Sequence, residues 1–389
     1  MLIKEKKINI SEFSYFLGLF LYVTYYFYKS TVFDYMIPNR LGVVLRVSAV
    51  MLFLIKIFLN DRFIVKEIIM YMLLILLTAI IVVNTQYLIV IDLVIVTLAS
   101  RNIDFDKIVK YVFFLVLFYT LSTIVLSMFG KIDNIQYVRN GSVRNSFGMK
   151  YSTVLGARIF YLTIMYCYIK RDKFRYYDYI LLVLLAVWVD IKCDARLAVI
   201  TILITGIGMG FYYILKNKNL MNHKFISFFM IYSTVISAII AIVTSFYYSP
   251  NNKFFVFLDK ILSRRLQLGS EAFSKYDIQL FGQHIQMNGY GGYASQTVGF
   301  KYFFIDSSFL VGLLCYGLIF FLIYLLIVTN FLKKCFYNNN LILLMVFTII
   351  SISNIVGEDL FNISFNIFTL AICADITDVK VIDKKIYIN

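Results

Sequence analysis

The chain has 389 residues, of which 61% are hydrophobic and 15% are charged, and its formal net charge is +15. A soluble globule of this length could not keep so much apolar surface from water, so lipid is its expected solvent. Two prolines and eighteen glycines suit helices better than turn-rich strands. The basic residues lie in short clusters between apolar runs, which is typical of membrane topology rather than of nucleic-acid binding.

Hydrophobic runs long enough to cross a bilayer follow one another along the chain. They predict helical spans over residues 13–29, 41–59, 67–84, 86–100, 109–129, 151–169, 177–191, 197–215, 225–248, 305–329, 341–356 and 358–376. The predicted fold is therefore all-α: a polytopic integral membrane protein of about twelve transmembrane helices, forming a single domain over residues 1–389.

One large polar loop, residues 249–304, interrupts the apolar runs late in the chain. Its first part, Lys253 to Leu266, places apolar residues on one face of a helix and is predicted to lie in the membrane interface. The short connections that carry most lysines and arginines alternate with connections that carry few. The positive-inside rule then predicts two cytoplasmic termini and an extracytoplasmic loop.

Three segments place arginines on the predicted external side. Arg144 follows the fifth span, and Arg158 lies about two turns inside the sixth. An arginine at that depth needs a partner or a wet cavity, because burying it in a bilayer costs about 2.5 to 3.5 kcal/mol on insertion scales. Arg158 is therefore a functional candidate. The alternatives are snorkelling to the interface and an ion pair with Asp194 or Asp92.

The other two segments combine arginines with carboxylates. In the turn between spans seven and eight, Arg196 could hold a phosphate. The alternative is that Asp194 caps the next helix and forms an ion pair within the turn. The long loop and its return to the membrane supply Arg264, Arg265, Glu271, His284 and Asp306. The alternative for this last set is an ordinary solvated surface.

Asp306 stands where an N-cap would open the tenth span, and a carboxylate at a membrane rim can also accept a proton. His284 is a second candidate for a catalytic or substrate-contacting role. Glu358-Asp359 is a second acidic pair, and the favoured interpretation of this pair is a helix-start signal. The five scattered cysteines show no ligand spacing. The sequence contains no Walker loop, dinucleotide fingerprint or His-Glu-x-x-His motif, so no metal and no cofactor is expected.

Several short motifs in this order resemble the Wzy-type oligosaccharide repeat-unit polymerases of bacterial O-antigen, capsule and exopolysaccharide pathways. The motifs are Arg144-Asn-Ser-Phe147-Gly148, Leu155-Gly156, Asp194-Ala-Arg196, Leu280-Phe-Gly282, Asp306-Ser-Ser-Phe309 and Tyr316-Gly317. Between the first two, many relatives carry a triplet similar to His-Pro-Asn, where this chain has Lys150-Tyr-Ser-Thr153. The resemblance implies a multi-helix glycosyltransferase in the bacterial plasma (inner) membrane, with a large extracytoplasmic loop over a cavity.

Such a polymerase transfers a growing glycan from polyprenyl diphosphate to a lipid-linked oligosaccharide repeat unit. A departing diphosphate needs cations more than it needs a general acid. The hypothesis from sequence gives Arg144, Arg158 and Arg196 the diphosphate, with help from Arg264 or Arg265. Asp306 or His284 then orients or deprotonates the acceptor. Expected partners are the lipid-linked oligosaccharide and membrane lipid, with a flippase and a chain-length regulator as further candidates and no nucleic acid.

Two other functions fit many of the same features. A lipid-linked oligosaccharide flippase or other transporter also needs many helices and a buried arginine, but transporters of that kind usually lack a long external loop. A ligase similar to the O-antigen ligases uses the same donor chemistry with another acceptor. Sequence alone separates the polymerase from the ligase poorly.

Overall fold

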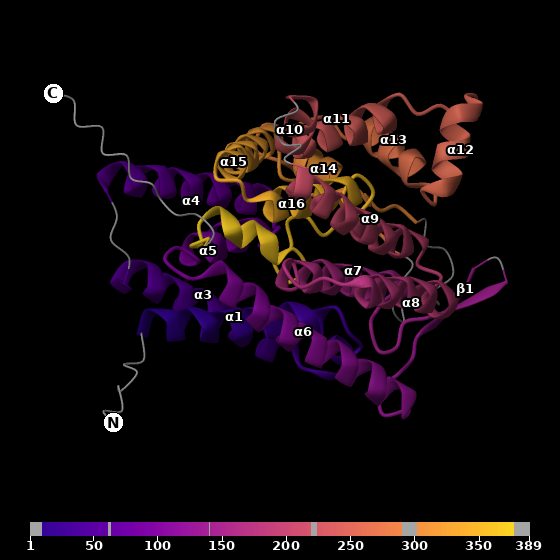
Figure 1. The fold of residues 1–389 in the computed structure, drawn as a ribbon, viewed down its shortest axis with the longest axis horizontal. Coiled ribbons are helices and arrows are strands. Elements are labelled where there is room, and N and C mark those ends of the chain that lie inside the picture. Colours follow the sequence, from indigo (N-terminus) through magenta and orange to yellow (C-terminus); the bar gives the residue numbers. More distant parts are fainter. Residues whose placement is uncertain (1–9, 61–63, 140, 219–223, 290–301, 377–389) are drawn as a thin grey trace.

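The computed structural model describes residues 10–60, 64–139, 141–218, 224–289 and 302–376, and these residues are almost entirely helical (Figure 1). The helices of the first half are α1 (Ile10–Lys29), α2 (Phe33–Met36), α3 (Asn39–Asn60), α4 (Val65–Thr85), α5 (Ile89–Ala99), α6 (Phe105–Met128), α7 (Ser152–Ile169) and α8 (Tyr176–Cys193). Those of the second half are α9 (Arg196–Lys218), α10 (Lys224–Ile231), α11 (Ser233–Phe246), α12 (Lys253–Ile261), α13 (Arg265–Lys275), α14 (Ser308–Leu310), α15 (Leu318–Tyr337) and α16 (Leu341–Ser353). A short antiparallel hairpin joins β1 (Gln136–Arg139) to β2 (Ser142–Asn145).

Six helices of the described chain are long and apolar enough to cross a membrane: α3, α4, α6, α7, α9 and α15. Helices α10 and α11 would form a seventh crossing if counted together, although they meet at a bend of 66°. Helices α5 and α16 are apolar but shorter. The predicted class, a helical membrane protein, is thus confirmed, whereas the number of twelve spans stays a prediction.

The structure departs from the predicted spans near the end of the chain. The tenth predicted span is divided into α14, the π-helical turn η3 (Val311–Cys315) and α15, with Gly317 between the last two. The twelfth, residues 358–376, is largely irregular and contains only the 3-10 helix η4 (Ile367–Ile372). Side chains hold this segment in place of a helical ladder: Asn366 donates to the Leu360 carbonyl at 2.8 Å.

The predicted amphipathic helix at the start of the long loop is two helices. Ser263 and Arg264 adopt positive φ angles and separate α12 from α13. The Asp259 carboxylate of α12 accepts hydrogen bonds from the Leu266 and Gln267 amides at 2.8 and 3.1 Å, so it caps α13. This capping explains why an acidic residue on α12 is buried.

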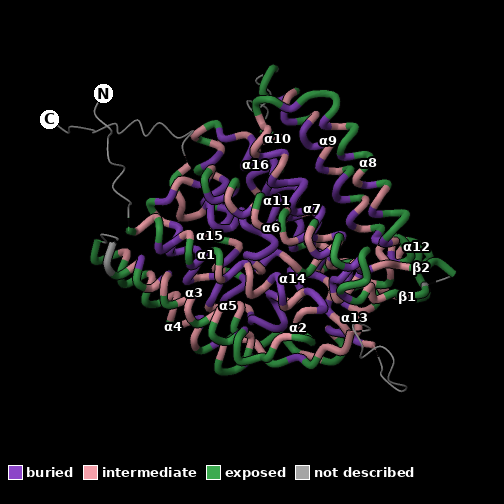
Figure 2. Tube along the Cα trace, turned by 90° about the horizontal axis from the view of Figure 1, so that it is seen from below, coloured by how far each residue is buried: buried purple, intermediate pink, exposed green. Residues whose placement is uncertain are grey.

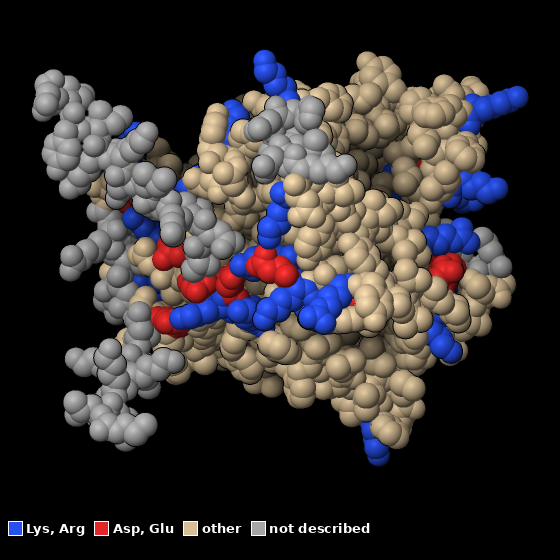
Figure 3. All heavy atoms as spheres, in the orientation of Figure 1, with Lys and Arg blue, Asp and Glu red and all other residues tan. Residues whose placement is uncertain are grey.

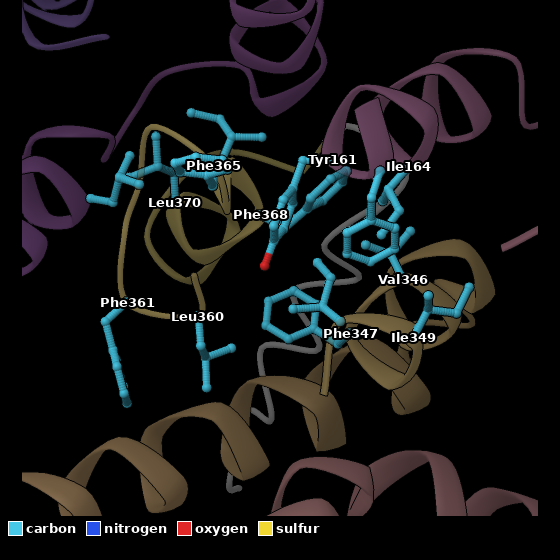
Figure 4. Close-up of a cluster of buried hydrophobic side chains, with 14 of the residues drawn as sticks. Tyr161, Ile164, Val346, Phe347, Ile349, Leu360, Phe361, Phe365, Phe368 and Leu370 are labelled. Atoms are coloured by element: carbon cyan, nitrogen blue, oxygen red, sulfur yellow. The ribbon is translucent and has the colours of Figure 1, made fainter. Parts of the chain in front are cut away.

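The core contains α7, α16 and the irregular segment that follows α16. Figure 4 shows Tyr161 and Ile164 of α7 close to Phe347 and Ile349 of α16 and to Phe368 of η4. In Figure 2 buried positions fill the middle of the molecule and exposed positions form its periphery. The segment from residue 357 to 366 therefore lies on a packed apolar base, which fixes the position of the polar groups that it carries.

Ion pairs gather the predicted cytoplasmic connections at one end. They are Glu12–Lys107 at 2.8 Å, Glu67–Arg101 at 3.0 Å, Asp106–Arg171 at 2.7 Å and Asp172–Lys216 at 3.0 Å. Figure 3 shows acidic and basic atoms side by side in one belt, whereas most of the remaining described surface in that view carries neither. The starts of α1, α4 and α6 therefore lie at the same end of the molecule as the residues after α5 and α7 and the end of α9.

Candidate acidic site between the long loop and the helix core

Asp306 lies at the return of the long loop to the helices, opposite the start of α13. Its Oδ1 atom is 3.7 Å from Nη2 of Arg265, and both side chains are largely buried. Asp306 does not cap α14, since that helix begins at Ser308 with Ser307 in the cap position. The residue instead pairs with Arg265 and accepts a hydrogen bond from Tyr302.

Hydrogen bonds bring a second acidic segment to the same place. The Ser308 amide donates to the Gly357 carbonyl at 2.6 Å, and the Ser308 hydroxyl lies 2.9 Å from Asn354 Oδ1 and 2.8 Å from the same carbonyl. These bonds fasten the residues after Asp306 to the turn that carries Glu358. We call Arg265, Asp306, Glu358 and Asp359 the acidic site.

In the acidic site, Asp306 contacts Arg265 of the long loop, and the Glu358 and Asp359 carboxyl groups lie within the electrostatic influence of the same arginine. Burial raises the pKa of Asp306, whereas Arg265 and the Tyr302 hydrogen bond oppose that rise. Glu358 remains accessible to solvent. The surrounding protein nevertheless restricts the hydration of the Glu358 carboxylate, and this restriction raises the pKa of Glu358. The neighbouring charges of Asp359 and Asp306 raise that pKa further. A carboxyl group with a raised pKa is a candidate general base.

Two tyrosines at the start of the helix core and at the end of the loop lie within the electrostatic influence of Glu358. Burial raises the pKa of Tyr151 to about 12, with a contribution from Glu358. Burial likewise raises the pKa of Tyr302, to which Asp306 and Glu358 contribute. Both phenols therefore stay neutral at ordinary pH and can donate hydrogen bonds at the edge of the acidic site.

Arg158 supports the turn that carries Glu358 and Asp359. Its side chain is 1% exposed, its guanidinium carbon lies 3.5 Å from the ring centroid of Phe365, and it donates to the Ser364 carbonyl and hydroxyl oxygens. Its charge also opposes the rise that burial causes in the pKa of Asp359. Arg158 is thus anchored to the irregular segment after α16, and neither Asp194 nor Asp92 is among its hydrogen-bond acceptors in the described chain.

Asp92, one of the partners considered for Arg158, instead belongs to a separate buried cluster. Arg46 of α3 donates twice to the Asp92 carboxylate of α5, at 2.6 and 2.7 Å, and Tyr26 of α1 donates at 2.8 Å. A two-point arginine–carboxylate contact inside the apolar helices is strong and directional. This cluster fastens α1, α3 and α5 to one another.

Arg144 and Arg196 meet at one carboxylate away from the acidic site. Asp194 Oδ2 lies 3.9 Å from Arg144 Nε, and Asp194 Oδ1 lies 3.4 Å from Arg196 Nε. Arg144 also donates to the Cys193 carbonyl at 3.2 Å. Asp194 itself, in a left-handed conformation, ends α8. The ion pair considered from sequence is therefore present, with Arg144 as an additional member.

The remaining two predicted site residues lie on the long loop. Arg264 is exposed and occupies the left-handed turn between α12 and α13. His284 is exposed, its Nδ1 atom is 2.9 Å from the Thr85 carbonyl at the end of α4, and its ring stacks on Tyr87. His284 thus attaches the loop to the turn between α4 and α5.

The seven predicted site residues accordingly occupy several local positions. Arg265 and Asp306 are in direct contact, and Arg144 and Arg196 share Asp194. The interpretation of Glu358 and Asp359 as a helix-start signal is wrong, since residues 358–366 form no helix. Sequence reasoning made this assignment because two acidic residues before an apolar run also mark an ordinary helix start. The signal that could have found them is the polar sequence around them, with Asn354, Asn362 and Asn366 close by in an otherwise apolar region.

Two of the motifs that carry the family resemblance form a single contact. The Gln283 amide donates to the Cys315 carbonyl at 3.1 Å, and the Leu318 and Ile319 amides donate to Gln279 and Leu280 at 3.0 and 3.2 Å. We call this contact the glycine clasp, because a Cβ atom on Gly282 would lie 2.2 Å from the Cys315 carbonyl oxygen and one on Gly317 only 2.3 Å from the Gly282 nitrogen. The glycine clasp fixes the loop next to the break before α15.

Comparison with known proteins assigns no family to the chain. No protein-family model matches it, and neither the curated proteins nor the solved structures contain a match. Among the described residues, no group of three or more histidines, cysteines, aspartates and glutamates is arranged to hold a metal ion. The functional interpretation therefore rests on the sequence motifs and on the geometry of the acidic site.

Proposed function

We propose that the protein is a membrane glycosyltransferase that moves a growing glycan from polyprenyl diphosphate to a lipid-linked oligosaccharide repeat unit. The observation that carries the proposal is the acidic site, where a solvent-accessible carboxyl group with a raised pKa lies near an arginine of the long loop. Glycosyl transfer from a diphosphate needs these two groups: a base for the acceptor hydroxyl and a cation for the leaving group.

In this proposal Arg265 binds the diphosphate of the donor. Its guanidinium lies 3.7 Å from Asp306, which is longer than a hydrogen bond, so a phosphate oxygen would compete with Asp306 for its N–H donors. A charge-assisted hydrogen bond to phosphate contributes about 1.5 to 3 kcal/mol. Arg144 and Arg196 remain candidates for a second diphosphate contact, and Arg158 holds the turn that carries the base.

Glu358 is the proposed base, with Asp306 orienting Arg265. The oxygen of the acceptor hydroxyl forms a bond to the anomeric carbon of the donor sugar, and the bond from that carbon to the diphosphate oxygen breaks. The electron pair of the broken bond leaves with the diphosphate, and the hydroxyl proton passes to Glu358. The step requires no metal, nucleotide or redox partner to balance.

The flippase and the ligase remain alternatives. The ligase shares the donor chemistry, so the acidic site supports it equally, and only the acceptor distinguishes the two enzymes. A flippase would move the intact lipid-linked oligosaccharide across a bilayer without breaking the glycosyl bond. We favour transfer because the accessible Glu358 is arranged near a loop arginine rather than in a described ion pair.

The test uses purified protein in liposomes and polyprenyl-diphosphate-linked repeat units extracted from the source cells. The wild type is expected to release free polyprenyl diphosphate and to lengthen the glycan. Glu358→Gln should slow the transfer about 100-fold or more, the usual contribution of a general base. Arg265→Ala should slow it about 10- to 100-fold, as expected for one charged phosphate contact.

Two substitutions of surface residues serve as controls for the lost charges. Glu271→Gln removes an acidic group that pairs with Lys275 on the surface of α13, and Lys131→Ala removes an exposed cation in the connection after α6. Both should keep the wild-type rate. Transfer that survives Glu358→Gln unchanged would refute the assigned base. Movement of intact lipid-linked oligosaccharide across the bilayer, without diphosphate release, would refute the transferase.

A further inference from the structure

The first helix of the long loop presents an apolar stripe that the rest of the described chain leaves uncovered. Phe254, Phe257 and Ile261 follow one another at helical spacing on α12, and they are 63%, 62% and 43% exposed. The opposite face of the same helix is turned toward the protein, since Asp259 is buried where it caps α13. In water, a stripe of three large exposed apolar side chains on one short helix marks an interaction surface.

Basic residues border this stripe. Lys253 and Lys260 are exposed and lie seven residues apart on α12, so they form one edge beside the apolar residues, and the exposed Arg264 follows in the turn after the helix. An apolar stripe with a cationic edge fits a partner surface whose interior is apolar and whose outer layer is anionic. The head-group region of a bilayer with acidic lipids has this chemistry.

The position of α12 fits the same surface. The end of α11, which precedes α12, exposes Phe246 and Tyr247 by 59% and 65%, so apolar surface continues from a helix of the bent crossing into the loop. In Figure 1 α12 runs across the direction of α7 and α8, at the end of the molecule where β1 also lies. A helix in that orientation would be parallel to the plane of a membrane crossed by α7.

We propose that α12 is an in-plane membrane anchor that inserts Phe254, Phe257 and Ile261 among the acyl chains and sets Lys253, Lys260 and Arg264 against the phosphates of anionic lipids. The anchor has a consequence for the acidic site. Because α13 begins with Arg265 directly after the left-handed turn at Arg264, the depth of α12 fixes the height of Arg265 above the bilayer.

The experiment measures the depth of a tryptophan placed on the stripe. Trp188 is the only tryptophan of the chain, so Phe257→Trp is made together with Trp188→Phe. The protein is reconstituted in vesicles of phosphatidylcholine and phosphatidylglycerol whose acyl chains are brominated. We expect blue-shifted emission that the brominated chains quench and that aqueous iodide quenches only weakly. Phe254→Trp in the same background is the second probe if the first variant does not fold.

A matched probe on the neighbouring helix provides the control. Gln267 is exposed on α13 and polar, and Gln267→Trp should be quenched by iodide and spared by the brominated lipid. Strong iodide quenching of Phe257→Trp, without quenching by brominated lipid, would overturn the anchor. Emission that instead changes with the protein-to-lipid ratio, again without bromine quenching, would show a second copy of the chain on the stripe and would overturn it equally.

The charged edge is tested separately. Without phosphatidylglycerol, the bromine quenching of Phe257→Trp should weaken, and Lys253→Glu with Lys260→Glu should abolish the difference between the two lipid mixtures. Equal quenching in both mixtures before the charges are changed would refute the selectivity for anionic lipid. These measurements need no glycan, so they stand or fall independently of the proposed transferase.

Discussion

The surrounding protein limits the hydration of Glu358, and together with the charges of two neighbouring carboxyl groups this makes the Glu358 carboxyl group harder to ionise. Arg265 favours the charged form of all three acids, but the other two have further support. Asp306 accepts a hydrogen bond from Tyr302, and Asp359 lies within the influence of Arg158. One site thus contains carboxyl groups that are alike in chemistry and unlike in their surroundings. Such differences are how proteins give similar acids different tasks.

The raised pKa of Glu358 predicts the pH dependence of transfer. A base must be ionised to accept a proton, so activity should rise with pH through the pKa of Glu358, above the usual glutamic acid range near about 4.3. Asp359→Asn removes a neighbouring negative charge, which lowers the pKa of Glu358. The acidic limb of the rate profile should then move to lower pH by about one unit, the size of a typical shift from a close charge.

The measurement is the rate of diphosphate release by the reconstituted protein over a pH series. Asp277→Asn is the control, because Asp277 is an exposed aspartate of the same loop. Its profile should coincide with that of the wild type. A limb that moves to higher pH in Asp359→Asn, or an identical shift in both variants, would contradict the assigned coupling.

At the scale of elements, the glycine clasp connects the long loop to the break before α15. Gly317 has φ +96° and ψ 160°, a conformation that only glycine adopts readily. The same residue approaches the backbone of residues 280–282, so a side chain would be excluded by space as well as by conformation. The close backbone contact therefore requires glycine at both positions, Gly282 and Gly317. The loop cannot shift along α15 without losing three backbone hydrogen bonds.

Gly317→Ala should accordingly destabilise the protein by about 2 to 4 kcal/mol, the sum of a strained backbone and an overpacked contact. Gly130→Ala is the matched control, because Gly130 also has a positive φ, +67°, but a Cβ atom added there would have no neighbouring atom within 4 Å. It should cost about 1 kcal/mol. Thermal unfolding in detergent measures both, and equal losses would show that the close approach contributes nothing.

Hydropathy was a good guide to the long helices from α1 to α9, whose predicted bounds agree with the structure to within a few residues. It was a poor guide after residue 304, because the mean hydropathy of a segment does not reveal where side-chain hydrogen bonds replace the backbone hydrogen bonds of a helix. Asn354 shows the difficulty: it donates to Tyr161 at 3.0 Å and to Ile350 at 2.8 Å. The first of these contacts joins residues far apart in sequence, and no local pattern contains it.

The candidate site was predictable only in part, because contacts between residues far apart in sequence leave no local pattern. Asp306 and Arg265 were recognised as individual candidates, but their contact depends on how the long loop folds back. The convergence of all five arginines on one diphosphate stays a prediction. Arg158 lies instead against Ser364 and Phe365, a partnership that only the irregular course after α16 creates.

At the scale of the whole molecule, ion pairs between different helices tie together one end of the described chain, and Arg265 of the acidic site lies toward the other. The first end joins α1, α4, α6, α7 and α9 through paired side chains, and further lysines remain exposed there. The other end carries the β1–β2 hairpin, α12 and α13 (Figure 1). An excess of cations on short connections favours the cytoplasmic side. We therefore expect the acidic site to face away from the cytoplasm, where lipid-linked repeat units are joined in the proposed reaction.

This orientation can be measured with single cysteines and a membrane-impermeant maleimide. Val138 on β1 is 76% exposed, and Tyr176 at the start of α8 and Tyr337 at the end of α15 are 77% and 78% exposed. In intact cells or spheroplasts Val138→Cys should react, whereas Tyr176→Cys and Tyr337→Cys should react only after permeabilisation. Four of the five native cysteines are buried, and Cys373 is replaced by serine to remove the fifth. Reaction of Tyr337→Cys in intact cells would place the acidic site in the cytoplasm, where the proposed polymerisation could not use it.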